Sequence, residues 1–275
     1  MSLSIAFTEP TFNRILVLLV GAVLAKGRRT ITSILWIMGR LAPGHMTDYH
    51  RVFSRAPWSL FPLGKILAAT TMPWMPDGPV VVSMDDTTAQ HKGKKVYAKG
   101  CHHDAVRSSH SHVVHRWGHK WVVLAIVVQL PFASRPWALP VLCALYRPRD
   151  LNEEEGRRHK TPIILAQGLM CILIRWFPDK RFIFLGDGGY ASHALARFCR
   201  RHRRRATLVS RFHGDAALYD PPPTYRGNGR PRVKGRKRKS PQDVVASGPL
   251  RKATVDWYGA TSRAVKIKSD QAYPA

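Results

Sequence analysis

Short apolar runs recur between residues 79 and 211, separated by Gly, Pro and charged residues. Runs of this length that are rich in β-branched and aromatic residues predict buried strands. Two longer segments carry apolar residues at helical spacing, and Pro162 suits the first turn of the earlier one. The predicted strands are Pro79–Thr88, Trp121–Leu130, Trp137–Tyr146, Arg181–Asp187 and Ala206–Arg211, and the predicted helices are Thr161–Phe177 and Ser192–Arg204.

The first 75 residues show helical spacing. Their basic polar faces fit either a DNA-reading helical module or a plain helical subdomain with solvated charges, and the sequence leaves both open. Helices are predicted from Thr11 to about Gly27, from Thr30 to Gly39, over Thr47–Arg55 and near Leu63–Ala69. The first of them is predicted to bury the face formed by Phe12, Ile15, Leu16, Leu19, Val20 and Val23.

The order of the later elements predicts an α/β fold. Three early strands joined without helices predict an antiparallel meander, and a helical crossover then returns a parallel strand to the sheet. This is the order of a ribonuclease H-like mixed sheet flanked by helices. We expect a helical region at 1–75, the sheet domain at 76–213 and a basic, β-rich insertion at 214–275, with an extended piece at Val96–Ala98 and a hairpin within Thr254–Lys268.

Two of the apolar strands end on aspartates. Asp85 and Asp86 close the first, and Asp187 closes the fourth. Since side chains alternate along a strand, Asp85 and Asp86 point to opposite faces, and either could serve a site, or both could simply cap the strand. If the two strands are parallel neighbours, their carboxyl ends meet, which is where open α/β sheets bind ligands.

The charge of the chain favours a polyanionic partner. There are 44 Lys and Arg against 17 Asp and Glu, a net charge of +27. Nucleic acid is the commonest partner of such a chain, and no basic amphipathic helix points to a membrane. The run Arg226–Lys239 is either a solvated insertion without regular structure or a phosphate-binding arm, and its charge density favours the arm. The predicted DNA-binding residues are Arg226, Arg230, Arg232, Lys234, Arg236, Lys237, Arg238, Lys239, Lys94, Lys95 and His103.

Histidine and cysteine give weaker signals. Six histidines lie between His102 and His119, but their spacing fits no usual zinc finger, so phosphate contacts are the better interpretation. The four cysteines are scattered, which suggests a reducing compartment. The apolar segment Ile15–Ala25 is too short to span a bilayer. We therefore expect a cytoplasmic protein without a membrane partner.

Paired aspartates in a basic protein suggest a metal site. Side by side they repel each other, and a divalent cation relieves that repulsion. Carboxylate oxygens suit Mg²⁺ or Mn²⁺, and two such ions can cleave a phosphodiester bond. The sequence therefore predicts two-metal phosphodiester chemistry on DNA.

Several strings resemble the DDE transposases of bacterial insertion sequences, more narrowly the insertion sequence 4 superfamily with its DDE superfamily endonuclease domain. They are Met84–Thr88, Lys92–Lys95, Gly100–Val106, Trp117–Val123 and Gly186–Tyr190. The resemblance implies a ribonuclease H-like core that uses two Mg²⁺ or Mn²⁺ ions to cut and join DNA at transposon ends in a bacterial cytoplasm. It makes Asp86, the aspartate before Thr, the first catalytic and metal-binding acid and Asp187 the second, with Asp85 and Thr87 in support.

The resemblance also leaves a gap. The third acid of the family is a glutamate on a late helix, and no Glu follows Glu155 here. We therefore expect a truncated transposase with impaired catalysis. The alternatives are a DNA-binding fragment without catalysis and a ribonuclease H-like nuclease, and a homodimer is left open. The late aspartates that could substitute are Asp215, Asp220, Asp243, Asp256 and Asp270.

Overall fold

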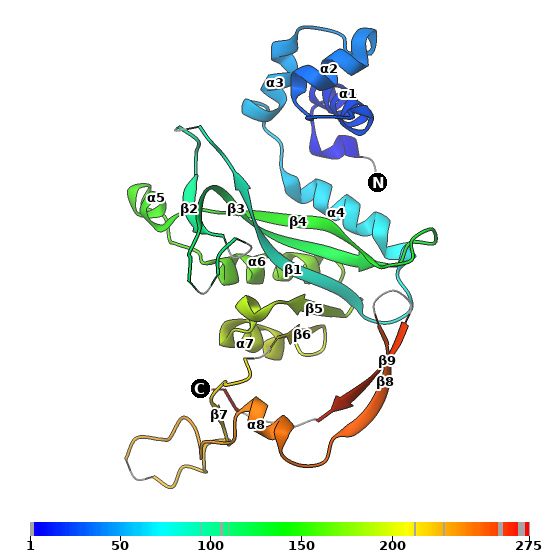
Figure 1. The fold of residues 1–275 in the computed structure, drawn as a ribbon. Coiled ribbons are helices and arrows are strands. Elements are labelled where there is room, and N and C mark those ends of the chain that lie inside the picture. The colour runs from blue at the N-terminus through cyan, green and yellow to red at the C-terminus, as the bar shows by residue number, and fades with distance from the viewer. Residues whose placement is uncertain are drawn as a thin grey trace. The chain divides into compact units, whose positions relative to one another are not determined.

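A computed structural model describes residues 3–93, 95–104, 107–109, 111–211, 213–227, 229–257, 261–268 and 273–274 of the chain (Figure 1). The chain divides into two compact units, Met1–Met72 and Pro73–Ala275. The first is helical and the second is built on a mixed sheet. The finer division into three regions stays a prediction.

The four predicted helices of the first unit are confirmed. Its core consists of Leu18, Ile34, Met38, Tyr49 and Val52. The Thr30 hydroxyl caps the second helix by accepting from the Ser33 amide, as its place before Ile31 suggests. The elements are η1 (Leu3–Ala6), α1 (Glu9–Leu24), α2 (Ile31–Met38), η2 (Gly39–Leu41), α3 (Met46–Ser54) and α4 (Leu60–Thr71), followed by η3 (Met72–Trp74).

The buried face predicted for α1 is wrong, and its start lies earlier, with Thr8 rather than Thr11 at the N-cap. Leu18 and Gly21 are buried, whereas Leu16, Leu19, Val20 and Val23 are exposed. The helix is apolar on most sides, so periodicity alone cannot select a face. Gly21 selects it instead, because a Cβ there would lie 2.5 Å from Ile34 Cγ2 and would prevent the close approach of α2.

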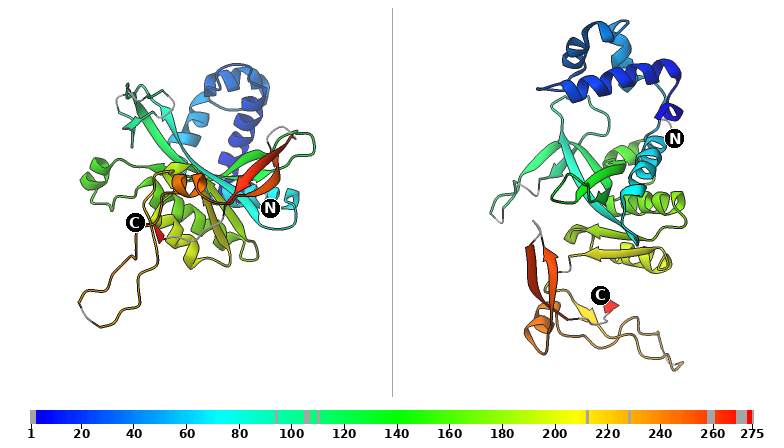
Figure 2. Two further views of the ribbon diagram at one scale, coloured as in Figure 1. Left: turned by 60° about the horizontal axis from the view of Figure 1, so that its bottom comes forward. Right: turned by 90° about the vertical axis from the view of Figure 1, so that its right-hand side faces the viewer.

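The second unit contains a six-stranded mixed sheet. Its order is β2-β3-β1-β5-β6, with β4 also paired to β3 (Figures 1 and 2). The predicted meander is confirmed by antiparallel β1–β3 and β3–β4 pairs, and the predicted parallel β1–β5 pair is confirmed as well. The strands are β1 (Val80–Gln90), β2 (Gly100–His103), β3 (His115–Val128), β4 (Trp137–Tyr146), β5 (Phe182–Gly186) and β6 (Ala206–Ser210).

Two helices complete the core of this unit. α6 (Pro162–Trp176) packs against β3 and β4, α7 (His193–Arg201) packs against β6, and the two helices contact each other (Figure 2). The apolar alternation of β1 buries Val80, Val82 and Met84 and leaves the intervening side chains partly exposed. The mixed α/β fold is therefore confirmed, and the ribonuclease H-like assignment stays a proposal.

The polar segment before Trp121 differs from its prediction. β3 begins at His115, and its first residues pair with β2, a strand that the sequence did not indicate. Val96–Ala98 is a turn rather than an extended piece, with Ala98 at φ 56°. Only two of the four β2 residues are buried, so these strands are held by backbone pairing rather than by an apolar face that a hydropathy pattern could reveal.

The C-terminal part contains small elements. The predicted hairpin is confirmed as an antiparallel pair of β8 and β9. The described residues of Arg226–Lys239 form a loop, as predicted. The end of this loop is held by an isolated antiparallel bridge between Lys237 and Tyr219 and by the Arg238 amide, which donates to Leu218 O at 2.8 Å. The elements are α5 (Arg149–Glu154), η4 (Gly188–Tyr190), β7 (Leu218–Tyr219), α8 (Pro241–Ala246), β8 (Arg251–Trp257), β9 (Thr261–Ile267) and β10 (Tyr273–Pro274).

Candidate active site

A small acidic pocket lies where the parallel pairing of β1 and β5 ends; β1 itself continues past the predicted end at Thr88 to Gln90, paired with β3. The parallel register ends at the pair Met84 and Gly186, so the next residues of both strands emerge at one edge of the sheet. A pocket of about 220 Å³ opens there. The structure thus brings together the three aspartates singled out in the sequence. The pocket is lined by Asp85, Asp86, Asp187, Gly189 and Tyr190, with Pro162 and Ile163 from the start of α6.

Asp187 is held by the turn that follows it. One carboxylate oxygen, Oδ1, accepts a hydrogen bond from the Gly189 amide at 2.9 Å, which caps η4. The Asp187 backbone oxygen accepts from the Ser210 hydroxyl at 2.8 Å, which ties this turn to the end of β6. These two hydrogen bonds fix the position of Asp187, and its second carboxylate oxygen, Oδ2, remains for another ligand.

Asp86 is paired with a cation from the neighbouring strand. Its Oδ2 lies 3.1 Å from Lys120 Nζ, and both side chains are partly buried. Lys120 pairs in register with Thr88, so it is the diagonal neighbour of Asp86 across the antiparallel ladder. This ion pair offsets one of the three negative charges of the pocket.

The surroundings of Asp85 raise the pKa of its carboxyl group. Its Oδ1 accepts from the Asp86 amide at 2.8 Å. Its side chain is exposed by area, yet the surrounding protein displaces enough water to raise the pKa of the Asp85 carboxyl, and the charges of Asp86 and Asp187 raise that pKa further. Positive charge in this pocket would therefore be favourable.

Tyr190 forms the buried wall of the pocket. It is 3% exposed, and among the described residues its hydroxyl has no hydrogen-bond partner. Burial, together with the charges of the three aspartates, raises the pKa of Tyr190 far above its usual value, so the phenol stays protonated and can only be used as a neutral donor or acceptor. A Cβ on Gly186 would lie 2.6 Å from Tyr190 Cβ, so the glycine makes room for this ring.

The donor set fits a hard divalent cation. It consists of carboxylate oxygens, which Mg²⁺ and Mn²⁺ prefer. Within the described ranges, no three His, Cys, Asp or Glu side chains converge closely enough to hold a metal by themselves. An ion bound here would therefore take carboxylate oxygens from one or two aspartates and fill its other positions with water or substrate oxygens, as Mg²⁺ commonly does.

The other predicted residues lie outside this pocket. Thr87 is exposed on β1, and Lys95 and His103 are exposed near and on β2. Lys94 lies outside the described residues, as does Asp270. Asp220 forms an ion pair with Arg238, and Asp243 accepts from the Ser240 hydroxyl. Asp215 is exposed and, like the other two, does not line the pocket.

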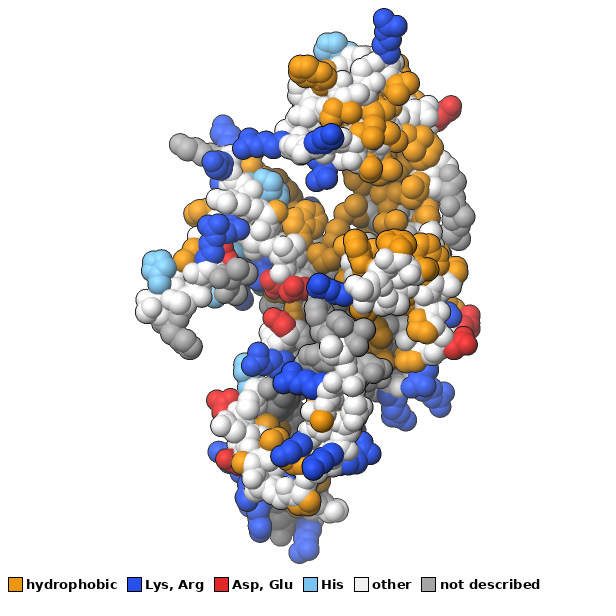
Figure 3. Space-filling view, turned by 45° about the vertical axis from the view of Figure 1, so that its right-hand side comes forward, with side chains coloured by type: hydrophobic (Ala, Val, Ile, Leu, Met, Phe, Trp, Pro, Cys, Tyr) orange, Lys and Arg blue, Asp and Glu red, His pale blue; other side chains and the backbone are white. Residues whose placement is uncertain are grey.

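The predicted basic segment is well exposed. All eight of its named cations are exposed except Arg238, which is half-buried. Lys234 Nζ lies 4.2 Å from the centre of the Tyr219 ring. Figure 3 shows Lys and Arg side chains spread over one face of the chain, with few Asp and Glu among them. The described part of the segment therefore presents positive charge to solvent over most of its length.

Sequence reasoning gave no role to Tyr190, which lines the pocket, or to Lys120, which pairs with Asp86 beside it. Tyr190 stood in a quoted string without a role, because nothing in the sequence shows that its ring turns back beside Gly186. Lys120 could have been found from the antiparallel pairing of the first two predicted strands, which places a cation diagonally opposite Asp86.

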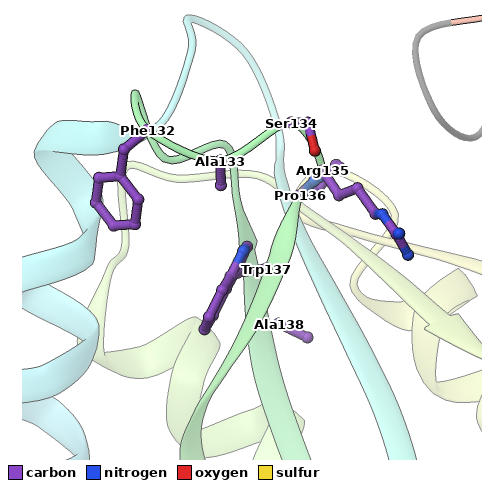
Figure 4. A pocket seen from close by; sticks show the side chains of 7 residues that line it. All are labelled: Phe132, Ala133, Ser134, Arg135, Pro136, Trp137 and Ala138. Carbon is purple, nitrogen blue, oxygen red and sulfur yellow. The ribbon is translucent and has the colours of Figure 1, made fainter.

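A larger cavity of about 520 Å³ lies at the connection between β3 and β4 and is formed by residues 132–138 (Figure 4). Phe132, Trp137 and Arg135 line it together with small residues, and no carboxylate does. It adjoins the register pair Val128 and Trp137, whereas Asp86 pairs with Val122. It therefore lies at the opposite end of these strands from the acidic pocket.

Comparison with known proteins identifies the sequence family. The family of DDE superfamily endonucleases matches residues 2–264. Among solved structures, the chain is similar to a piggyBac transposase in a synaptic complex with hairpin DNA, at 9% identity and a TM-score of 0.39, over 95% of this chain and 52% of that one. The chain thus spans about half the length of that transposase. No curated protein sequence matches it. None of the helices in the described ranges is long and apolar enough to cross a bilayer.

Proposed function

Because the chain belongs to the DDE superfamily endonucleases, we propose that its acidic pocket cleaves DNA phosphodiester bonds with divalent metal ions. The observation that carries this proposal is the single pocket that Asp85, Asp86 and Asp187 line where the parallel pairing of β1 and β5 ends. More specifically, we propose that the protein is a transposase with a ribonuclease H-like core. It acts on transposon ends, where it cleaves the DNA and carries out strand transfer.

The charge of the pocket explains why metal is needed. Three carboxylates repel a phosphodiester, and Lys120 offsets only one of them. Asp86 and Asp187 would hold two Mg²⁺ or Mn²⁺ ions, with Asp85 in support. Bound there, the metal would activate a water or 3′-hydroxyl nucleophile and stabilise the leaving oxygen.

The remaining residues of the pocket position the groups that react. Lys120 fixes the orientation of Asp86, and the Gly189 amide fixes that of Asp187. The Tyr190 hydroxyl, which has no protein partner among the described residues, donates to a phosphate oxygen of the substrate. Phosphate contacts that give affinity come from outside the pocket, from Lys95, His103 and the exposed basic segment at Arg226–Lys239.

A second candidate function is DNA binding without catalysis. Among the described residues, no acid other than Asp85, Asp86 and Asp187 lines the pocket, so none stands in for the missing glutamate. The exposed basic segment would bind phosphates with or without cleavage. Such a protein would occupy transposon ends and block them. The two candidates differ in chemistry and share their DNA affinity.

A nicking assay separates them. Supercoiled plasmid is incubated with the purified chain and Mn²⁺, and nicked product is measured for the wild type, Asp86→Asn, Asp187→Asn and the exposed control Asp179→Asn. The proposal expects nicking by the wild type and the control and a loss of at least about 100-fold in either site variant. Binding without nicking by the wild type would favour the second candidate. Nicking that survives in both site variants would contradict the first.

A further inference from the structure

A second pocket, which is strongly basic, lies between the end of β4 and the start of α6. It has a volume of about 430 Å³. Its charged lining consists of four cations and includes no carboxylate. The lining residues with polar side chains are Arg147, Asn152, Arg157, Arg158 and Lys160.

The walls of this pocket are held in place by hydrogen bonds. Asn152 is 4% exposed, and its side-chain amide contacts Arg147 O at 3.2 Å, Pro148 O at 3.1 Å and His159 Nδ1 at 3.2 Å. Its backbone oxygen accepts from the Arg157 amide at 2.7 Å. One buried side chain therefore joins both ends of the segment 147–159, so the pocket is formed before any ligand binds.

The positive charge of the pocket is only partly balanced. The Glu155 carboxylate forms ion pairs with Arg147 and with Arg157. In the second pair, Glu155 Oε2 lies 3.1 Å from Arg157 Nε. Arg158 and Lys160 are exposed, and the acidic residues of α5 do not line the pocket. Arg147 Nε is buried and has no hydrogen-bond partner among the described residues. The pocket thus keeps an excess of cations, and clustered Arg and Lys side chains are the groups that bind phosphate oxygens.

The basic pocket adjoins the acidic one along the chain. Lys160 and Leu165 line the basic pocket, while Pro162 and Ile163 between them line the acidic pocket. Two residues of extended chain span at most about 7 Å, and one DNA strand rises about 3.4 Å per nucleotide. A strand with one phosphate at the aspartates would therefore carry another phosphate within a few nucleotides of Lys160.

We propose that this basic pocket is a phosphate subsite that takes a backbone phosphate of the bound DNA strand and sets the position of the strand at the aspartates. The inference rests on the proposed function for its ligand. The same chemistry would also accept free phosphate, so the experiment separates these two sources.

The first arm measures duplex binding by fluorescence anisotropy over a salt series, in EDTA so that cleavage plays no part. Arg158→Gln with Lys160→Gln is compared with the wild type and with Arg203→Gln plus Arg204→Gln, an exposed pair with the same loss of charge. We expect the pocket variant to weaken binding about tenfold and to reduce the salt slope by about 1, as the loss of one phosphate contact would. The proposal would be overturned if the two pairs of substitutions weakened duplex binding equally, or if the pocket variant left binding unchanged.

The second arm measures thermal unfolding in inorganic phosphate against chloride at equal ionic strength, without DNA. We expect phosphate to raise the Tm of the wild type and of the control pair but not that of the pocket variant. Phosphate protection without any effect of the variant on duplex binding would assign the pocket to free phosphate and overturn its role on DNA. If the wild type bound no duplex, the proposed function would fail while this arm still decided whether the pocket binds phosphate.

Discussion

Lys120 reaches across the β1–β3 ladder to Asp86, with its ammonium nitrogen 3.1 Å from the carboxylate oxygen Oδ2. It is the cation that offsets the charge of an aspartate in a pocket lined by three. A metal ion entering the pocket would share this carboxylate with Lys120 or displace it. The strength of metal binding should therefore depend on Lys120.

Replacing Lys120 with Met should strengthen Mn²⁺ binding by about three- to tenfold, because it removes a positive charge next to a proposed ligand. Isothermal titration with Mn²⁺ measures the effect. Lys180→Met, which changes an exposed lysine outside the pocket, is the control and should leave the affinity unchanged. Unaltered affinity in the Lys120 variant would show that Asp86 is not a ligand.

Removing the Tyr190 hydroxyl should lower activity without lowering stability. The hydroxyl is buried and has no partner among the described residues, so Tyr190→Phe should leave the free energy of unfolding unchanged or raise it by up to about 1 kcal/mol, while nicking falls. Tyr49→Phe is the matched control, since that hydroxyl donates to Pro43 O at 2.9 Å. It should lose about 1 kcal/mol in urea unfolding. A similar loss for Tyr190→Phe would reveal a structural hydrogen bond.

Glycine is required at position 186 by the close approach of Tyr190. In Gly186→Ala the new Cβ would lie 2.6 Å from Tyr190 Cβ, and we expect a loss of about 1–3 kcal/mol of folding stability with displacement of the ring. Gly168→Ala is the comparison, because a Cβ in the middle of α6 meets nothing within 4 Å. It should stabilise by about 0.5–1 kcal/mol. Equal effects of the two substitutions would contradict this packing.

The raised pKa of Asp85 gives the wild type a specific pH dependence. A carboxyl whose pKa is higher in the folded state binds its proton more tightly there, so it favours folding at low pH and loses that contribution as pH rises above its ordinary value of 3.8. Asp85→Asn should therefore be more stable than the wild type at pH 7, by less than about 1 kcal/mol because the side chain is exposed. The difference should vanish below pH 3.8. An unchanged or lower stability of the variant at pH 7 would be the contrary result.

The sequence predicts only the part of the pocket that follows from the order of the strands. Apolar runs that end at Asp86 and Asp187, with a helical crossover before the second, are enough to predict that the two strands are parallel neighbours and that the aspartates lie close together. Identifying Lys120 requires the register of the β1–β3 pair, and identifying Tyr190 requires the path of the turn that brings its ring beside Gly186. Neither a strand register nor the path of a turn can be recognised from the hydropathy of the sequence.

The prediction failed where apolar burial does not decide the structure. The polar strand Gly100–His103 is held by backbone pairing to β3, which composition does not reveal. The buried face of α1 was misassigned because Leu16 and Leu19 are as apolar as Leu18, and the contact that separates them is the approach of α2 at Gly21. Both errors concern contacts between elements rather than elements themselves.

Asp86 and Asp187 are proposed to bind divalent metal together, and Mn²⁺ titration of single variants tests this most directly. Wild type and Asp179→Asn should bind Mn²⁺ alike, while Asp86→Asn and Asp187→Asn should each weaken binding by at least about tenfold. The double variant should lose little more than either single one, because one carboxylate alone cannot hold the metal that the two share. Full Mn²⁺ affinity in either single variant would contradict the claim.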